Sequence, residues 1–202
     1  PGLHRIVVVG GGAGGLELAT RLGDKLGRKG KAHVTLIERS RTHIWKPLLH
    51  EIAAGSMDLG VHEIDYLALA YWNGFVYRVG EMTGIDRERR VVKVAPFVDE
   101  EGRQVTSMRE VGYDVLVIAI GSGTNDFGTP GVREHTIALE TAGEAARFHK
   151  RLVNACIRAN TQDAPLAPEQ LQVAIIGAGA TGTELSAELH KTTRQLDRKS
   201  VV

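Results

Sequence analysis

The sequence contains a single cysteine, Cys156, among its 202 residues, so no disulfide can form within the chain. The first residues, PGLHR, lack the apolar stretch that forms the core of a signal peptide. These two absences predict a reducing, cytosolic compartment. The eight histidines are scattered, and none lies at metal-ligand spacing from another histidine or from the cysteine, so we expect no metal site.

Long apolar runs and an excess of one charge are also missing. The longest apolar run, VLVIAI at 115–120, is far shorter than the ~20 residues that cross a bilayer, so we expect no membrane-spanning segment. The 25 basic and 24 acidic side chains give a formal charge of +1, and no long run of one sign supports nucleic-acid binding. With 43% hydrophobic and 24% charged residues, the composition is that of a soluble globular protein.

Glycine, in contrast, is abundant, and its excess is local. Against a typical usage of about 7%, the chain has 24 glycines, many of them in two short windows at 10–15 and 177–182. Such local clusters exclude collagen-like and low-complexity chains.

The first glycine window lies between a strand and a helix. RIVVVG at 5–10 is a β-branched run that ends in glycine, and apolar residues then recur at helical spacing up to Leu26. HVTLIER at 33–39 predicts a second strand, which completes a strand-helix-strand unit.

The middle of the chain predicts a short helix over 60–70 and then short antiparallel strands at FVYRV, RVVKV and QVTSM. Turn-like residues at 84–86 and 99–102 separate these strands. YDVLVIAIG at 113–121 is apolar on both faces, which is typical of a strand in the middle of a parallel sheet.

The last third repeats the opening design. The spacing predicts a helix over 141–160 with Cys156 on its apolar face, and we therefore expect Cys156 to lie in the core. Residues 161–170, with two prolines, predict a linker. The segment from 171 onward again predicts strand, glycine turn and helix. The fold class is therefore α/β, Rossmann-like, with a parallel sheet, an inserted antiparallel meander and the start of a second Rossmann-like domain.

Gly10, Gly12 and Gly15 match G-x-G-x-x-G in the context that gives this pattern its meaning. Gly10 allows the sharp turn, Gly12 lets the backbone approach a pyrophosphate, and Gly15 lets the helix pack on the strand. Glu38 ends the second strand, where a carboxylate can accept both hydroxyls of a ribose. The alternative is a plain turn with a surface glutamate.

Gly177, Gly179 and Gly182 repeat the pattern after VAIIG. At the same spacing, the acidic residue of this second unit would fall at about position 205, beyond Val202, so the choice between NADH and NADPH is not encoded in the chain. Two such turns in one chain are typical of proteins that pass a hydride between a nicotinamide and a flavin.

The strings HIWKPLLHEIAAGSMD at 43–58, SGTNDFGTPGV at 122–132 and GATGTELSAELH at 179–190 resemble the type II NADH dehydrogenases, bacterial single-subunit NADH:quinone oxidoreductases. These are flavoproteins with two dinucleotide-binding domains. The resemblance implies an FAD-binding domain over 1–160, a linker over 161–170, and the start of an NADH-binding domain over 171–202. It implies oxidation of NADH without proton pumping, hydride transfer to FAD and reduction of a membrane quinone.

The resemblance also assigns residues. FAD would be held by Gly10, Gly12, Ala13, Gly14, Gly15, Glu38, Arg39, Pro47, Leu48, Met82, Ala119 and Gly121. NADH would be held by Gly177, Gly179, Ala180, Thr181 and Gly182. Glu184 would lie near the nicotinamide and the flavin as a catalytic residue. The alternative is that Glu184 has no catalytic role. Its carboxylate would then lie in the first turn of a helix and only interact favourably with the helix dipole.

The resemblance further implies a peripheral enzyme on the cytoplasmic side of the bacterial inner membrane. It would be anchored by C-terminal segments absent from this chain, and a homodimer is compatible with it. The fragment itself is expected to be soluble and inactive, with weak or absent flavin. KPLLHEIAAG has no cysteine where the disulfide reductases of the superfamily carry a redox pair, which excludes a dithiol relay. Ile120 stands where the superfamily often has threonine.

Several alternatives stay open from the residues alone. The same domains serve ferredoxin and rubredoxin reductases, and the chain on its own could be a nucleotide-binding module without turnover. His50 and Glu51 are adjacent on a helix and do not face each other, so a surface position is favoured over an acid-base pair. Asp114 could cap a turn or meet a cofactor, and it is left out of the site.

Overall fold

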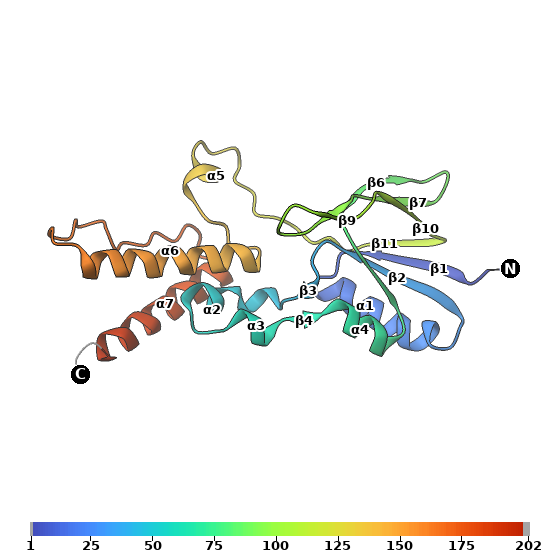
Figure 1. The fold of residues 1–202 in the computed structure, drawn as a ribbon, viewed down its shortest axis with the longest axis horizontal. Coiled ribbons are helices and arrows are strands. Elements are labelled where there is room, and N and C mark those ends of the chain that lie inside the picture. Colours follow the sequence, from blue (N-terminus) through green and yellow to red (C-terminus); the bar gives the residue numbers. More distant parts are fainter. Residues whose placement is uncertain (1, 200–202) are drawn as a thin grey trace. The chain divides into compact units, whose positions relative to one another are not determined.

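The computed structural model describes residues 2–199 and confirms the α/β fold class (Figure 1). Its contacts divide the chain into two compact units. Unit 1 comprises the residues up to His43 together with Glu63–Ser122, and unit 2 comprises Ile44–His62 together with the residues from Gly123 onward.

A parallel sheet of order β11-β1-β2-β5 forms the centre of unit 1. Its strands are β1 (His4–Val9), β2 (Ala32–Glu38), β5 (Val76–Val79) and β11 (Val115–Ile118). Helix α1 (Ala13–Leu22), which continues as the π-helical turn η1 (Gly23–Gly27), and helix α4 (Tyr66–Asn73) pack on one face of this sheet. The predicted strand-turn-helix-strand opening is therefore confirmed.

The other face of the sheet carries the antiparallel meander. Its strands are β6 (Met82–Asp86), β7 (Val91–Val94) and β10 (Arg109–Gly112), in the order β10-β7-β6. Successive side chains of a strand point to opposite faces. Val8 therefore packs with Leu36 beneath the helices, while Val7 and Val9 pack with the meander. The continuous apolar run of β1 follows from this burial on both faces.

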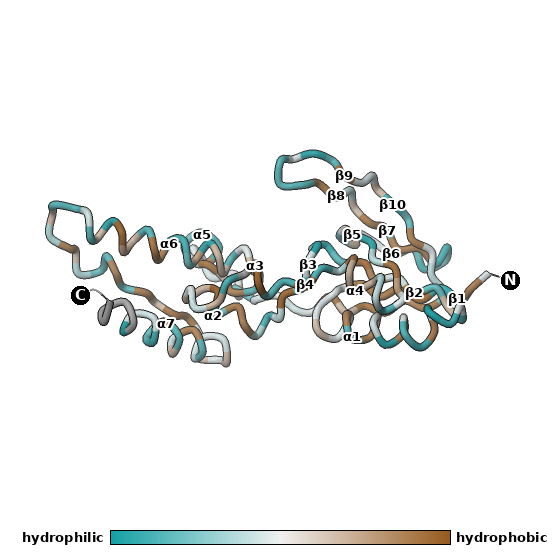
Figure 2. The backbone as a smooth tube through the Cα atoms, turned by 60° about the horizontal axis from the view of Figure 1, so that its bottom comes forward, coloured by the Kyte–Doolittle hydropathy of each residue, from teal (hydrophilic) through white to brown (hydrophobic). Residues whose placement is uncertain are grey.

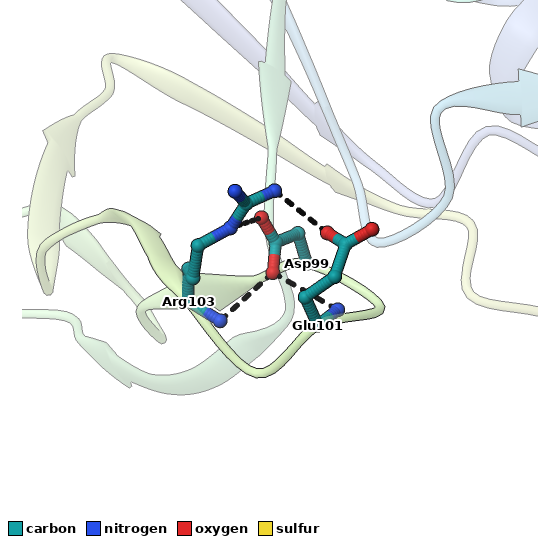
Figure 3. Close-up of polar contacts among 3 residues, drawn as sticks. All are labelled: Asp99, Glu101 and Arg103. Carbon is teal, nitrogen blue, oxygen red and sulfur yellow. Dashed lines mark hydrogen bonds and ion pairs between the residues drawn. The ribbon is translucent and has the colours of Figure 1, made fainter.

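A separate hairpin, β8 (Phe97–Val98) and β9 (Gln104–Thr106), has a hydrophilic tip (Figure 2). Figure 3 shows how one carboxylate closes the turn. Asp99 accepts hydrogen bonds from the backbone N–H groups of Glu101, at 3.1 Å, and Arg103, at 2.8 Å, and Arg103 Nε lies 2.8 Å from the second Asp99 oxygen. These bonds, led by the Arg103 amide, lower the pKa of Asp99. The predicted turn at 99–102 is confirmed.

The strand predictions in the middle of the chain are partly wrong. FVYRV does not join the meander: β5 pairs parallel with β2, because α4 carries the chain back across the sheet. Residues 84–86 are not a turn but lie in β6, which pairs with β7. β11 is not in the middle of the sheet. Among the described residues nothing pairs with its outer edge, and Val115 and Ile118 are 44% and 47% exposed.

The helix predicted over 60–70 is interrupted. α3 (Leu59–His62) ends before a two-residue strand, β4 (Ile64–Asp65), which pairs with β3 (Thr42–His43), and α4 begins only after that. Asp65 caps α4 by accepting a hydrogen bond from the Ala68 N–H at 2.9 Å. An N-cap residue has extended backbone, so it separates two helices rather than continuing one.

Unit 2 is helical in the described residues. It contains η2 (Lys46–Leu48), α2 (Leu49–Ala54), α3, α5 (Val132–His135), α6 (Ala142–Thr161) and α7 (Ala180–Lys199). Its core joins α2 to α6 and α7 through Leu49, Ile52, Ala53, Ala145 and Leu185. A capping box of Thr141 and Glu144 begins α6, so the predicted helix over 141–160 is confirmed.

Two predictions for unit 2 are wrong. Cys156 is exposed, because the unit packs its other helices only against the first turns of α6. Residues 171–176 form no strand, and Ile176 is 82% exposed. A parallel strand needs a neighbour for its hydrogen bonds, and none of the described residues pairs with this segment.

Gly55→Ala is expected to destabilise unit 2 by about 2 kcal/mol or more. Gly55 ends α2 at φ +80°, and a Cβ there would overlap the imidazole of His149 on α6. Gly128→Ala is the matched control, because Gly128 has φ +67° with no atom within 4 Å of an added methyl group, so it should cost only about 1 kcal/mol. Urea unfolding measures both, and equal losses would contradict the role of His149.

Candidate functional site

The first glycine turn is held together by contacts that leave no room for side chains. Gly10 has φ +101°, and a Cβ there would overlap the carbonyl oxygen of Ala119. A Cβ on Gly15 would overlap the carbonyl oxygen of Gly10. Gly10 N–H donates to the Ile37 carbonyl at 2.8 Å, which joins the turn to β2. Gly10 and Gly15 are therefore required by the fold, as the motif predicted.

Gly12 and Gly14 face open space instead. A Cβ on either would meet nothing within 4 Å. Gly12 is the N-cap of α1, and neither a capping side chain nor an acidic residue is present in the first turn of that helix. Helix α6, in contrast, has both in its capping box. The start of α1, including Ala13, therefore presents backbone amides and the positive end of a helix dipole to an anion.

Glu38 lies at this turn. One of its carboxylate oxygens accepts a hydrogen bond from the Gly11 N–H at 2.6 Å, and the other accepts one from the Ser40 N–H at 3.0 Å. The side chain is half-buried, and the neighbouring Arg39 is exposed. A carboxylate thus stands beside the open amides, at the end of β2, which is the arrangement that fits an adenosine diphosphate.

A buried network of three rings, His43, Tyr66 and Tyr77, contacts the backbone next to the turn. The sequence motifs do not predict this network. Tyr66 Oη donates to the Gly11 carbonyl at 2.6 Å, and His43 Nδ1 lies 3.1 Å from the same oxygen. Tyr66 stacks on Tyr77 with ring centroids 5.3 Å apart, and Tyr77 Oη donates to the Ser40 carbonyl at 2.6 Å. The two tyrosines thus fix the backbone at Gly11 and at Ser40, the two residues whose N–H groups donate to Glu38.

The protonation of these tyrosines follows from their surroundings. Burial, followed by the charge of Glu38, raises the pKa of both phenols. Both hydroxyls are therefore protonated at neutral pH and can act as donors. In the sequence, no short motif joins Tyr66 to Gly11 or Tyr77 to Ser40, so the network has no local signal.

Of the remaining predicted residues of unit 1, Ala119 contacts the turn directly, since it lies against Gly10 and Gly15. Ala119 N–H donates to the Val9 carbonyl at 2.7 Å, which holds the end of β11 against β1. Gly121 follows with φ +72° and is exposed, and Ile120 is 63% exposed. Met82 begins β6 and packs on the core of the meander.

Asp114 has a structural explanation. Its carboxylate accepts a hydrogen bond from the Arg5 N–H at 2.8 Å and one from the Arg5 guanidinium at 3.0 Å. This pairing lowers the pKa of Asp114 to about 2. Asp114 therefore joins the starts of β1 and β11.

The second glycine turn repeats the local geometry of the first. Gly177 has φ +103°, and a Cβ on Gly182 would overlap the carbonyl oxygen of Gly177. Thr183 N–H donates to the Gly179 carbonyl at 3.0 Å, as Leu16 N–H donates to the Gly12 carbonyl at 2.9 Å. Gly179 faces open space, and Ala180 and Thr181 begin α7. The backbone of the second turn therefore has the same local geometry as that of the first, although residues 171–176 before it form no strand.

Glu184 does not lie in the position that a dipole role requires. The first turn of α7 contains no acidic residue, and the Glu184 carboxylate instead lies 3.4 Å from His50 Nδ1 on α2. The His50 side chain is only 14% exposed, so the surface position expected for it is wrong. Pro47 is exposed and Leu48 half-buried in η2, directly before α2 in unit 2.

Membrane spans and metal-binding groups are both absent from the described residues. No helix among them is both long and apolar enough to span a membrane. No three of their His, Cys, Asp and Glu side chains gather as a group that could hold a metal ion.

Comparison with protein families gives one match over nearly the whole chain. The family described as pyridine nucleotide-disulphide oxidoreductase matches residues 4–197. The type II NADH:quinone oxidoreductase of Haemophilus influenzae is 43% identical over 206 residues, which cover 96% of this chain and 46% of that protein. The mitochondrial external alternative NAD(P)H-ubiquinone oxidoreductase B4 of Arabidopsis thaliana is 27% identical, covering 92% of this chain and 31% of that protein.

Solved structures agree on the fold. NDH2 from Plasmodium falciparum in complex with NADH superposes with a TM-score of 0.77 at 23% identity, covering 94% of this chain and 37% of that one. The same protein in complex with RYL-552 gives a TM-score of 0.79 at 22% identity, with 97% and 38% covered. The chain spans less than half the length of each of these relatives.

Proposed function

Because the chain belongs to the pyridine nucleotide-disulphide oxidoreductase family, we propose that it is part of a type II NADH:quinone oxidoreductase. In this proposal residues 1–160 belong to the FAD-binding domain, 161–170 are a linker and 171–202 begin the NADH-binding domain. The observation that carries the proposal is the first glycine turn, whose open amides lie beside Glu38. The 43% identity to the Haemophilus influenzae enzyme supports the choice of subfamily.

The residues of unit 1 fit FAD. The amides at Gly12, Ala13 and Gly14 would bind its pyrophosphate, since no side chain competes for them. Glu38 would accept the ribose hydroxyls, with Arg39 next to it. Met82, Ala119 and Gly121 would line the same cofactor, and from unit 2 Pro47 and Leu48 would contact it. The chemistry supplied by bound FAD is acceptance of a hydride from NADH and transfer of two electrons to a quinone.

The residues of unit 2 fit NADH. Gly177, Gly179, Ala180, Thr181 and Gly182 would bind its pyrophosphate at the start of α7. Glu184 follows this turn closely, so its carboxylate would act near the nicotinamide half of the dinucleotide.

The setting of the reaction is also part of the proposal. The whole protein would bind the membrane peripherally on the cytoplasmic side of the bacterial inner membrane, through segments outside this chain, and take a membrane quinone as its second substrate. A homodimer is compatible with this setting. The names of the Haemophilus influenzae and Arabidopsis thaliana relatives, both quinone reductases, support a quinone over an iron-sulfur protein as the acceptor.

Steady-state oxidation of NADH by the full-length protein tests the proposal. We expect bound flavin that bleaches when NADH is added without oxygen, and rapid turnover with a short-chain ubiquinone but not with rubredoxin or ferredoxin. Turnover with the iron-sulfur proteins alone would favour the reductases that share these domains. If the full-length protein contains no flavin, the alternative of a nucleotide-binding module without turnover is favoured instead.

A further inference from the structure

We propose that His50 is a positioning residue that holds the Glu184 carboxylate beside the second glycine turn and offsets its charge, so that an anionic dinucleotide binds there more tightly. This inference rests on the proposed function, in which NADH occupies that turn. It assigns a role to a histidine for which the sequence predicted a surface position.

The packing of unit 2 fixes both partners. Leu49, next to His50, and Leu185, next to Glu184, are both buried in the core that joins α2 to α7. His50 is mostly covered, and Glu184 is half exposed, at 48%. The 3.4 Å separation of His50 Nδ1 and Glu184 Oε2 therefore follows from the position of two packed helices rather than from two free surface side chains.

The groups facing His50 are mostly acidic. On its own helix, Glu51 Oε1 lies 4.0 Å from His50 Nε2, and on α7 the charge of Glu188 also acts on His50. Glu188 is itself paired with Lys191 at 3.0 Å, which lowers the pKa of the Glu188 carboxyl. From α6, His149 reaches the end of α2 at Gly55. Each ring nitrogen of His50 therefore faces a carboxylate, Glu184 at Nδ1 and Glu51 at Nε2.

The position of Glu184 explains why its charge matters. It follows Gly182, the last glycine of the turn, by two residues, so the Glu184 carboxylate belongs to the same helix start as the amides that would bind a pyrophosphate. Two like charges at ~8 Å in a partly exposed site repel each other enough to weaken binding about three- to tenfold. A protonated His50 offsets this repulsion, and a neutral His50 does not. The two charge states of an imidazole can be compared by measuring binding at acidic and at alkaline pH.

A double-mutant cycle on the full-length holoenzyme tests the proposal. The probe is ADP-ribose, which carries the pyrophosphate but cannot reduce the flavin, and its dissociation constant is measured at pH 6.0 and pH 8.5. We expect His50→Gln to weaken binding about three- to tenfold at pH 6.0 and less than twofold at pH 8.5. In a Glu184→Gln background the same substitution should change binding less than twofold. For flavin reduction by NADH, His50→Gln should raise KM and leave kcat nearly unchanged.

His135→Gln is the matched control. His135 lies in the same unit, 3.8 Å from Glu134, but its side chain is 74% exposed and it is more than forty residues before the turn in sequence, so binding should not change. If His50→Gln does not fold, Glu184→Gln alone still tests the charge argument, because it should tighten ADP-ribose binding at pH 8.5.

Three outcomes would overturn the proposal. An equal loss at both pH values, or an equal loss with and without Glu184, would show that His50 has only a packing role. Weaker binding in Glu184→Gln would show that the carboxylate contacts the dinucleotide directly. If the wild-type holoenzyme binds neither ADP-ribose nor NADH, the proposed function itself fails, and the role of His50 fails with it.

Discussion

Replacing Gly15 with alanine is expected to destabilise unit 1 by about 3 kcal/mol or more, a large part of the 5–15 kcal/mol that stabilises a typical domain. The added methyl group would overlap the carbonyl oxygen of Gly10 and lie 3.1 Å from the Ala119 side chain. Both obstacles belong to the turn or to the sheet end, so neither can rotate away. α1 would have to separate from β1, which would expose the core around Val8 and Ala19.

Gly14→Ala is the matched control for that loss. Gly14 lies one residue earlier in the same helix, and a methyl group there meets nothing within 4 Å. Because alanine is the better helix former, this variant should unfold at the same urea concentration as the wild type or at a slightly higher one. Circular dichroism during urea unfolding compares the three proteins. A Gly15→Ala protein as stable as Gly14→Ala would mean that α1 and β1 are not packed as described.

The first glycine turn could be predicted because every requirement of it is local. A β-branched strand, a glycine at positive φ and a helix packed directly on that strand all fall within a few residues, and Gly10 and Gly15 mark the two places of closest approach. The second turn was predictable for the same reason. Its geometry is present even though the segment before it, 171–176, forms no strand and pairs with none of the described residues.

The strand partners could not be predicted in the same way. MTGID at β6 contains a glycine and an aspartate, so it has the composition of a turn, and only its pairing with β7 makes it a strand. β5 has the pattern of any short strand, and its direction is set by the helix α4 that precedes it. Apolar residues on both faces of β11 indicate that its two faces are covered. They do not indicate whether both of its edges form hydrogen bonds with neighbouring strands.

The site residues that the motifs do not predict depend on contacts between distant segments. Tyr66 reaches Gly11 across 55 positions of the chain, and no short motif joins them. In the sequence, the only acidic residue next to His50 is Glu51. The carboxylate that lies closer to the His50 ring, that of Glu184, comes from the far end of the chain. Motifs identify groups that bind a cofactor through a local turn. They do not identify side chains that act by fixing those groups in place.

Replacing Gly12 with valine is expected to separate the binding of FAD from the stability of the fold. Gly12 has φ −64° and ψ −175°, an extended conformation open to residues other than glycine, and a Cβ there meets nothing within 4 Å. The free energy of unfolding should therefore change by less than about 1 kcal/mol. The same side chain would fill the space over the amides of α1 that the pyrophosphate requires.

The expected loss of FAD affinity is about 100-fold or more, which corresponds to about 2.7 kcal/mol. It is measured by titrating FAD into the full-length apoprotein and following the quenching of flavin fluorescence, with unfolding measured on the same samples without FAD. Gly143→Ala is the control, because Gly143 lies in the first turn of α6 with equally open surroundings but far in sequence from the turn, so FAD affinity should stay unchanged. Gly15→Ala should lose FAD only because it loses the fold. A Gly12→Val protein that is stable but binds no flavin would therefore assign the open face of the turn to the cofactor. Tight FAD binding by Gly12→Val would instead mean that the pyrophosphate does not approach this turn.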